Sequence, residues 1–120
     1  MTTLLVRIAT DDDILARILE AERRVLAGDK TFEAVPEYNF ESYDDMHQTL
    51  SPSRLTILTT LAGQGPLSIR EVARRVGRDI QAVHRDVTML IKIGMIDRTD
   101  KGVEFPYTRI HFEYDVEAAA

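Results

Sequence analysis

The sequence contains no cysteine and no apolar run long enough to cross a membrane. Without cysteine there is neither a disulfide framework nor a thiolate metal site, so we expect a fold held by packing, in a reducing compartment. The apolar run after Met1 has the length of a strand, lacks a preceding basic region and meets three aspartates. We therefore expect no signal peptide and a cytoplasmic protein.

Signatures of common catalytic chemistry are also missing. The stretch GQGP at residues 63–66 lacks the Lys-Ser/Thr pair of a phosphate loop, and neither G-x-S-x-G nor H-E-x-x-H occurs. His47, His84 and His111 lie far apart, without a second ligand type at a metal-binding spacing. We expect no enzymatic activity, cofactor or metal; an enzyme with scattered carboxylates is an alternative that strongly shifted carboxylate pKa values would support.

The charge of the chain is unevenly distributed. Its formal net charge is -5, but residues 51–102 hold nine basic against five acidic residues, whereas residues 1–50 hold five against eleven. Five arginines lie within the 18 residues SIREVARRVGRDIQAVHR, residues 68–85. Such asymmetry indicates that one part of the chain is suited to an anion and the rest is not.

The first part of the chain predicts a strand followed by a helix. Residues 2–9 have the alternation of a short strand. Thr10 and the aspartates after it suit a helix N-terminus, with a metal site as the alternative for the aspartates, and Gly28 suits the close of a helix over residues 11–27. An apolar stripe on this helix is expected to form the interface of a two-fold homodimer: Ile14, Ile18, Ala21 and Val25.

The next segment mixes aromatic and acidic residues. Residues 31–35 and 38–40 read as short strand-like pieces, and residues 42–50 as a short helix or an irregular connection. We expect exposed aromatics beside carboxylates, a surface suited to a basic protein partner: Phe32, Tyr38, Phe40 and Tyr43 with Glu33, Glu37, Glu41, Asp44 and Asp45. The alternative is that the aromatics are packed inside and the carboxylates only aid solubility.

Three helices are predicted from residue 51 onward. The first begins at a serine cap with proline at the first helical position and ends at GQGP. The second begins at Ser68, where Glu71 completes a capping box, and ends at Gly77. The third is capped by Asp79 and ends at Gly94. Residues 95–105 then read as a hairpin, and residues 108–114 as a strand.

This order of helices and hairpin resembles a winged helix-turn-helix transcriptional regulator. The resemblance covers residues 51–106 and is carried by SIREVARRVGRDIQAVHRDVTMLIKIGMIDR, residues 68–98. It is also similar to a group of small predicted bacterial and haloarchaeal regulators, some of which resemble antitoxins. The resemblance implies a winged helix-turn-helix, to which we assign residues 51–114. Together with the expected strand and helix before it, we expect an α+β fold with an N-terminal strand-helix extension for dimerisation or partner binding (1–50) and a frayed tail (115–120).

We expect the protein to be a sequence-specific DNA-binding regulator. The expected partners are double-stranded DNA, a second copy of the chain and a basic protein such as a toxin. Polar residues near the start of a recognition helix reach base edges, whereas basic residues around it contact phosphates. The expected base contacts are Gln81, Ala82, His84, Arg85 and Thr88. The expected backbone contacts are Ser68, Arg70, Arg74, Arg75, Arg78, Arg98 and Lys101. The alternative is a protein-interaction module on the same fold, in which these arginines form a solvated face or internal ion pairs.

Overall fold

The computed structural model describes residues 2–31, 35–116 and 118 of the 120-residue chain. The described residues form an α+β fold that divides into two compact units. One unit holds residues 48–109 together with Thr2, and the other holds residues 3–47 and 110 onward. The strand-like piece expected at residues 31–35 includes 32–34, which lie outside the described residues, as do Phe32 and Glu33 of the expected acidic surface.

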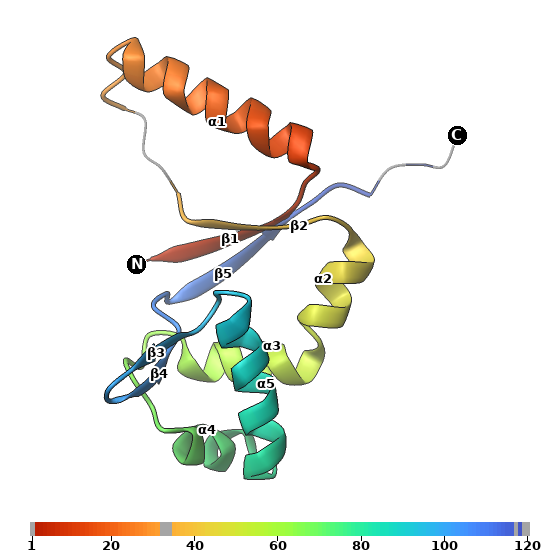
Figure 1. The fold of residues 1–120 in the computed structure, drawn as a ribbon, viewed down its shortest axis with the longest axis vertical. Coiled ribbons are helices and arrows are strands. Elements are labelled where there is room, and N and C mark those ends of the chain that lie inside the picture. The colour runs from red at the N-terminus through yellow and green to blue at the C-terminus, as the bar shows by residue number, and fades with distance from the viewer. Residues whose placement is uncertain (1, 32–34, 117, 119–120) are drawn as a thin grey trace. The chain divides into compact units, whose positions relative to one another are not determined.

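Three helices pack against one another in the unit of residues 48–109: α3 (Pro52–Leu61), α4 (Ile69–Val76) and α5 (Ile80–Lys92) (Figure 1). Each begins where the sequence predicts, because Ser51, Ser68 and Asp79 each accept a hydrogen bond from a backbone N–H of the first turn. Gly77 ends α4 in the left-handed conformation, with φ 68°. Only two residues, Arg78 and Asp79, separate this cap from α5.

The core of this unit is formed by one face of each helix and by the segment after α5. The spacing of aliphatic residues along α5 predicts its buried side, where Val83, Val87 and Leu90 are enclosed, although Ile80 is exposed. The buried side of α3 includes Ile57. The fully enclosed side chains are Ile57, Leu58, Leu61, Val72, Val83, Val87, Leu90, Ile96 and Phe105. This continuous packing holds α4 and α5 at fixed positions on α3.

The hairpin after α5 consists of β3 (Asp97–Thr99) and β4 (Gly102–Glu104) in antiparallel pairing. Its second strand also contacts the connection between α3 and α4, because Leu67 and Val103 exchange two backbone hydrogen bonds of 2.9 and 2.8 Å. Gly102 has φ 137°, and a Cβ built on it would lie 2.4 Å from the carbonyl oxygen of Leu67. A side chain at this position would therefore push the hairpin off the connection before α4.

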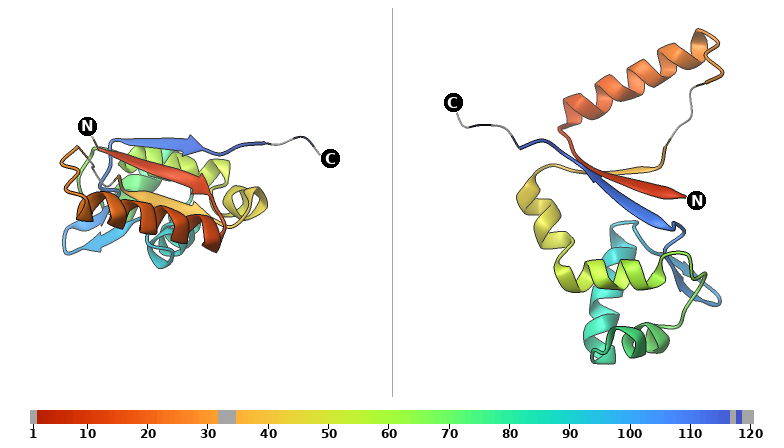
Figure 2. Two further views of the ribbon diagram at one scale, coloured as in Figure 1. Left: turned by 90° about the horizontal axis from the view of Figure 1, so that it is seen from above. Right: turned by 180° about the vertical axis from the view of Figure 1, so that it is seen from behind.

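The other unit contains a three-stranded sheet in the order β2-β1-β5, built from β1 (Thr3–Ile8), β2 (Glu37–Phe40) and β5 (Arg109–Glu113). β1 and β2 are parallel and are connected through α1 (Asp11–Leu26). α1 lies on one side of the sheet, and its C-terminal end diverges from the strands (Figures 1 and 2). The short helix α2 (Tyr43–Thr49) follows β2 and contains the boundary between the two units.

The start of α1 is a complete capping box. The Thr10 hydroxyl accepts a hydrogen bond from Asp13 N–H at 3.2 Å, and the Asp13 carboxylate accepts one from Thr10 N–H at 3.1 Å. This bond to the backbone lowers the pKa of Asp13. Asp13 thus has the capping role expected from the sequence. Among the described residues, none of the helices is both long and apolar enough to span a bilayer.

We predict that Gly102→Ala lowers the free energy of unfolding by about 3 kcal/mol, through strain at positive φ and displacement of the hairpin. Gly65→Ala is the matched control, since Gly65 has φ 71° but no atom within 4 Å of a built Cβ. It should cost only about 1 kcal/mol. Urea unfolding followed by circular dichroism measures both. Equal losses would show that the approach of Gly102 to Leu67 does not constrain the hairpin.

Candidate nucleic-acid interface

The candidate interface is the solvent-facing side of α5 with the positive charges around it. Gln81, His84, Arg85 and Thr88 are exposed on α5, at spacings of three and four residues that place them on one face. Ala82, expected beside them, is half-buried. Within the described residues, the side chains of Gln81, His84 and Arg85 form no intramolecular hydrogen bond or ion pair. These three side chains remain available to a ligand.

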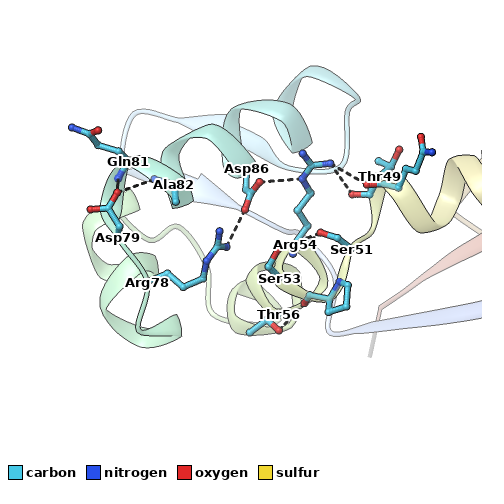
Figure 3. A network of polar contacts seen from close by, with 12 residues as sticks. Thr49, Ser51, Ser53, Arg54, Thr56, Arg78, Asp79, Gln81, Ala82 and Asp86 are labelled. Carbon is cyan, nitrogen blue, oxygen red and sulfur yellow. Dashed lines mark hydrogen bonds and ion pairs between the residues drawn. The ribbon is translucent and has the colours of Figure 1, made fainter.

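The orientation of α5 depends on Asp86, on the side of the helix opposite this exposed face. Its carboxylate accepts hydrogen bonds from Arg54 Nε of α3 at 3.1 Å and from Arg78 Nη1 at 2.9 Å (Figure 3). The Asp86 side chain is 16% exposed, so both ion pairs are shielded from solvent. Figure 3 shows Gln81 pointing away from this network. Two arginines from different elements thereby fix which side of α5 faces outward.

Arg54 also closes the end of the preceding helix. Its Nη1 donates to the carbonyl oxygens of Thr49 at 3.2 Å and Gln48 at 3.4 Å. These are carbonyls of the last turn of α2, which have no partner within the helix. Local sequence patterns do not predict the pairing of Arg54 with Asp86, because the two residues are 32 positions apart.

Glu71 restrains two of the arginines expected at the phosphate backbone. Its carboxylate accepts hydrogen bonds from Arg74, at 3.0 Å from Nε, and from Arg75 Nε at 3.0 Å. Arg75 also donates to the Gln64 side chain at 3.1 Å. The predicted capping box is only half formed among the described residues: Ser68 accepts from Glu71 N–H at 3.1 Å, but the Glu71 carboxylate is used by the arginines instead.

Hydrogen bonds from Arg74 and Arg75 lower the pKa of Glu71 to about 2. The folded-state pKa lies below the ordinary value of 4.5, so these bonds favour the folded state above pH 4.5. Their contribution is lost as the pH falls toward 2. Glu71 is therefore ionised, and both arginines are paired, throughout the neutral range.

The remaining cations expected at the backbone are differently placed. Arg78 is bound to Asp86, whereas Arg70, Arg98 and Lys101 are exposed and their side chains form no ion pair within the described residues. The three carboxylates between residues 68 and 92 are all engaged: Glu71 with arginines, Asp79 with the N–H groups of Gln81 and Ala82, and Asp86 with Arg54 and Arg78. No free carboxylate is left on α4 or α5 to repel an anion.

The residues expected at other interfaces lie in the unit of the sheet. On α1, Ile18 and Val25 are exposed, whereas Ile14 and Ala21 are half-buried. In the acidic segment, Glu41, Asp44, Asp45 and Tyr43 are exposed. The expectation that Phe40 is exposed is wrong, because it is 4% exposed and its ring lies 4.9 Å from that of Tyr38. A basic protein partner at this segment stays a prediction.

The chain belongs to the HVO_A0114 family, whose family model matches residues 49–112. The match includes α3, α4, α5, the hairpin and most of β5, and it contains every residue of the candidate interface. Residues 1–48, with α1 and β2, lie outside it. No curated protein matches the chain.

We predict that Asp86→Ala lowers the free energy of unfolding by about 2–3 kcal/mol, because it leaves two shielded guanidinium groups without their acceptor. Asp86→Asn, which keeps one acceptor oxygen, should cost less. Asp100→Ala in the exposed hairpin turn is the control and should stay within about 0.5 kcal/mol of the unaltered protein. Urea unfolding measures all three. A loss at Asp86 no larger than at Asp100 would exclude a structural role for the network.

Proposed function

We propose that the unit of residues 48–109 is a winged helix-turn-helix and that the protein is a transcriptional regulator binding double-stranded DNA at specific sequences. In this assignment α4 and α5 are the two helices of the helix-turn-helix, α5 is the recognition helix, and the β3–β4 hairpin is the wing. The short connection between α4 and α5, followed by the hairpin after α5, supports the assignment.

One observation carries the proposal: the carboxylates of α4 and α5 are all used internally, while Arg70, Arg85, Gln81 and His84 remain free on the surface. A DNA backbone is a closely spaced array of negative charges, and a free carboxylate facing it would be repelled. A protein-binding module on the same fold has no such need to neutralise each carboxylate. The sorting of charges therefore favours DNA.

Base recognition is assigned to the exposed face of α5. Gln81 and Arg85 lie one turn apart, and in a major groove a Gln side chain can pair with the N6 and N7 edge of adenine and an Arg side chain with O6 and N7 of guanine. His84 and Thr88 flank these two residues on the exposed surface. Arg70, Arg98 and Lys101 would contact phosphates, which fix position without reading sequence.

We expect Gln81→Ala and Arg85→Ala to weaken binding to a site selected from a random DNA pool by about 1–3 kcal/mol each and to relax preference at one base pair. Arg70→Ala should instead weaken binding to all sequences. It should also reduce the salt slope, the slope of log affinity against log salt concentration, by about one. Fluorescence anisotropy on selected and scrambled duplexes distinguishes the two patterns. Equal effects on both duplexes would show that Gln81 and Arg85 do not read bases. Binding to neither duplex would favour the alternative function, a protein-interaction module on the same fold.

A second expectation concerns Glu71, which would compete with phosphates for Arg74 and Arg75. Glu71→Gln should tighten binding to scrambled DNA about 3- to 10-fold, because surface ion pairs of this kind are worth roughly 0.2–1 kcal/mol each. It should also steepen the salt slope by about one to two. The helix cap is kept, since it uses the backbone N–H of Glu71.

Glu41→Gln is the control for Glu71→Gln. It makes the same change of residue and of net charge outside the proposed winged helix-turn-helix, at an exposed position whose side chain forms no ion pair within the described residues. Anisotropy titrations at several salt concentrations give both slopes. If the two variants gain affinity equally, the effect is net charge alone and the competition by Glu71 is refuted.

A further inference from the structure

α1 turns only a small part of its apolar surface toward the sheet, since Ile14 and Ala21 are half-buried and its larger aliphatic side chains are exposed. The side nearer the strands carries Arg17, whose Nη2 contacts Asn39 at 2.9 Å and Glu37 at 3.5 Å on β2. Glu37 also lies 3.8 Å from Arg7 on β1. Charged and amide groups thus join helix and sheet beside the half-buried Ile14 and Ala21, where a wholly apolar layer is usual.

The aliphatic side chains of α1 face the solvent instead. Leu15, Ile18 and Leu19 are 54–57% exposed, Val25 is 61% exposed and Leu26 is 80% exposed. We call these five residues the outer face of α1; their spacing of three, one, six and one residues gives a stripe along about three turns. Single exposed aliphatics are ordinary on a soluble protein, but a contiguous stripe of five is typical of a binding surface.

We propose that the outer face of α1 binds the same face of a second copy of the chain, with the two helices antiparallel about a two-fold axis. The five side chains offer on the order of 500 Å² from each copy, so that the pair approaches the lower limit of about 1,200 Å² for stable specific interfaces. The stripe is apolar except for Glu22 near its middle, and its aliphatic side chains can pack against the same side chains of a second copy, as a two-fold interface requires.

The charges on α1 decide the direction of pairing. Glu22 lies within the stripe, since Ile18, Leu19, Val25 and Leu26 are three or four residues away on the helix, and Asp11 and Asp12 lie in the first turn. Parallel pairing in register would place each of these carboxylates beside its counterpart in the second copy. Antiparallel pairing separates the two acidic turns to opposite ends and also opposes the helix dipoles. The second copy therefore runs in the opposite direction.

The proposed pairing depends only on features of α1, whereas a role for the dimer in reading DNA rests on the proposed function. A single recognition helix reads one half-site, and a two-fold dimer would bring two such helices to a symmetric operator. The stripe predicted from the sequence and the outer face of α1 share Ile18 and Val25. The predicted stripe also included Ile14 and Ala21, but these are half-buried. The outer face instead includes the exposed Leu15, Leu19 and Leu26.

The first test measures assembly without DNA. Sedimentation of the full chain at micromolar concentration should give a dimer, and Leu19→Lys should raise the dimer dissociation constant at least 100-fold. Ala16→Lys introduces the same residue at an exposed position of α1 outside the stripe and should leave the dimer intact. Far-UV circular dichroism checks that both variants are folded. A monomer for the unaltered chain, or a dimer unaffected by Leu19→Lys, overturns the proposal.

The second test measures direction and uses the absence of native cysteine. Leu19→Cys lies near the middle of α1 and should form a disulfide-linked dimer on oxidation, whereas Leu26→Cys lies at one end and should not, because antiparallel pairing places the two ends far apart. Cross-linking of both variants would mean parallel pairing and would overturn the proposed direction. Binding of scrambled DNA, measured separately, reports on the proposed function, so failure of the dimer and failure of DNA binding can be told apart.

Discussion

The Asp86 carboxylate accepts hydrogen bonds from Arg54 and Arg78, and the candidate interface depends on this pair of contacts. Arg54 belongs to α3, and Arg78 to the connection between α4 and α5, so one side chain of α5 is joined to both preceding elements. Apolar packing of Val83, Val87 and Leu90 determines which side of α5 faces the core. The ion pairs have directional geometry and reinforce that orientation, in which Gln81 and Arg85 face outward.

The distribution of ion pairs also explains how an acidic chain can present a surface suited to an anion. Glu71 on α4 and Asp86 on α5 each bind arginines, which neutralise their charge locally, and Asp79 caps the start of α5. Some arginines that would otherwise add to the positive surface are paired in the same way. The free positive charge is smaller than the sequence alone suggests: Arg70 and Arg85 remain near α5, whereas Arg98 and Lys101 share the hairpin with Asp97, Asp100 and Glu104, whose carboxylates form no ion pair within the described residues. In the proposed complex with DNA, such an arrangement would limit non-specific attraction, which grows with each phosphate contact.

The unit that contains α1 follows a different principle. Its helix meets the sheet through Arg17, Glu37 and Asn39, and the apolar side chains that could have formed a core there are outside. This arrangement is costly for an isolated chain, since exposed aliphatic surface is not removed from water. Burial against a second copy would recover that free energy. In the proposed dimer, the stability of this unit and its assembly would therefore depend on the same apolar side chains.

The local features of this protein follow directly from residues that are neighbours in the chain. Ser68, Asp79 and Gly77 mark helix boundaries because a cap is an interaction between residues two to four positions apart, and the hairpin is set by turn residues. The positive charge around residues 68–85 and the polar outer side of α5 were likewise readable from composition and helical period.

The free charges and the solvent-facing side of α1, in contrast, depend on contacts between distant segments of the folded chain. Arg54 and Asp86 are far apart in sequence, and Gly102 requires its conformation only because Leu67 lies against it. The periodicity of α1 identifies an apolar stripe but not its direction, because that depends on Arg17 finding Glu37 and Asn39 on a strand formed later in the chain. Local hydrogen bonds are encoded by neighbouring residues, whereas pairings of this kind exist only once distant segments have been brought together by folding.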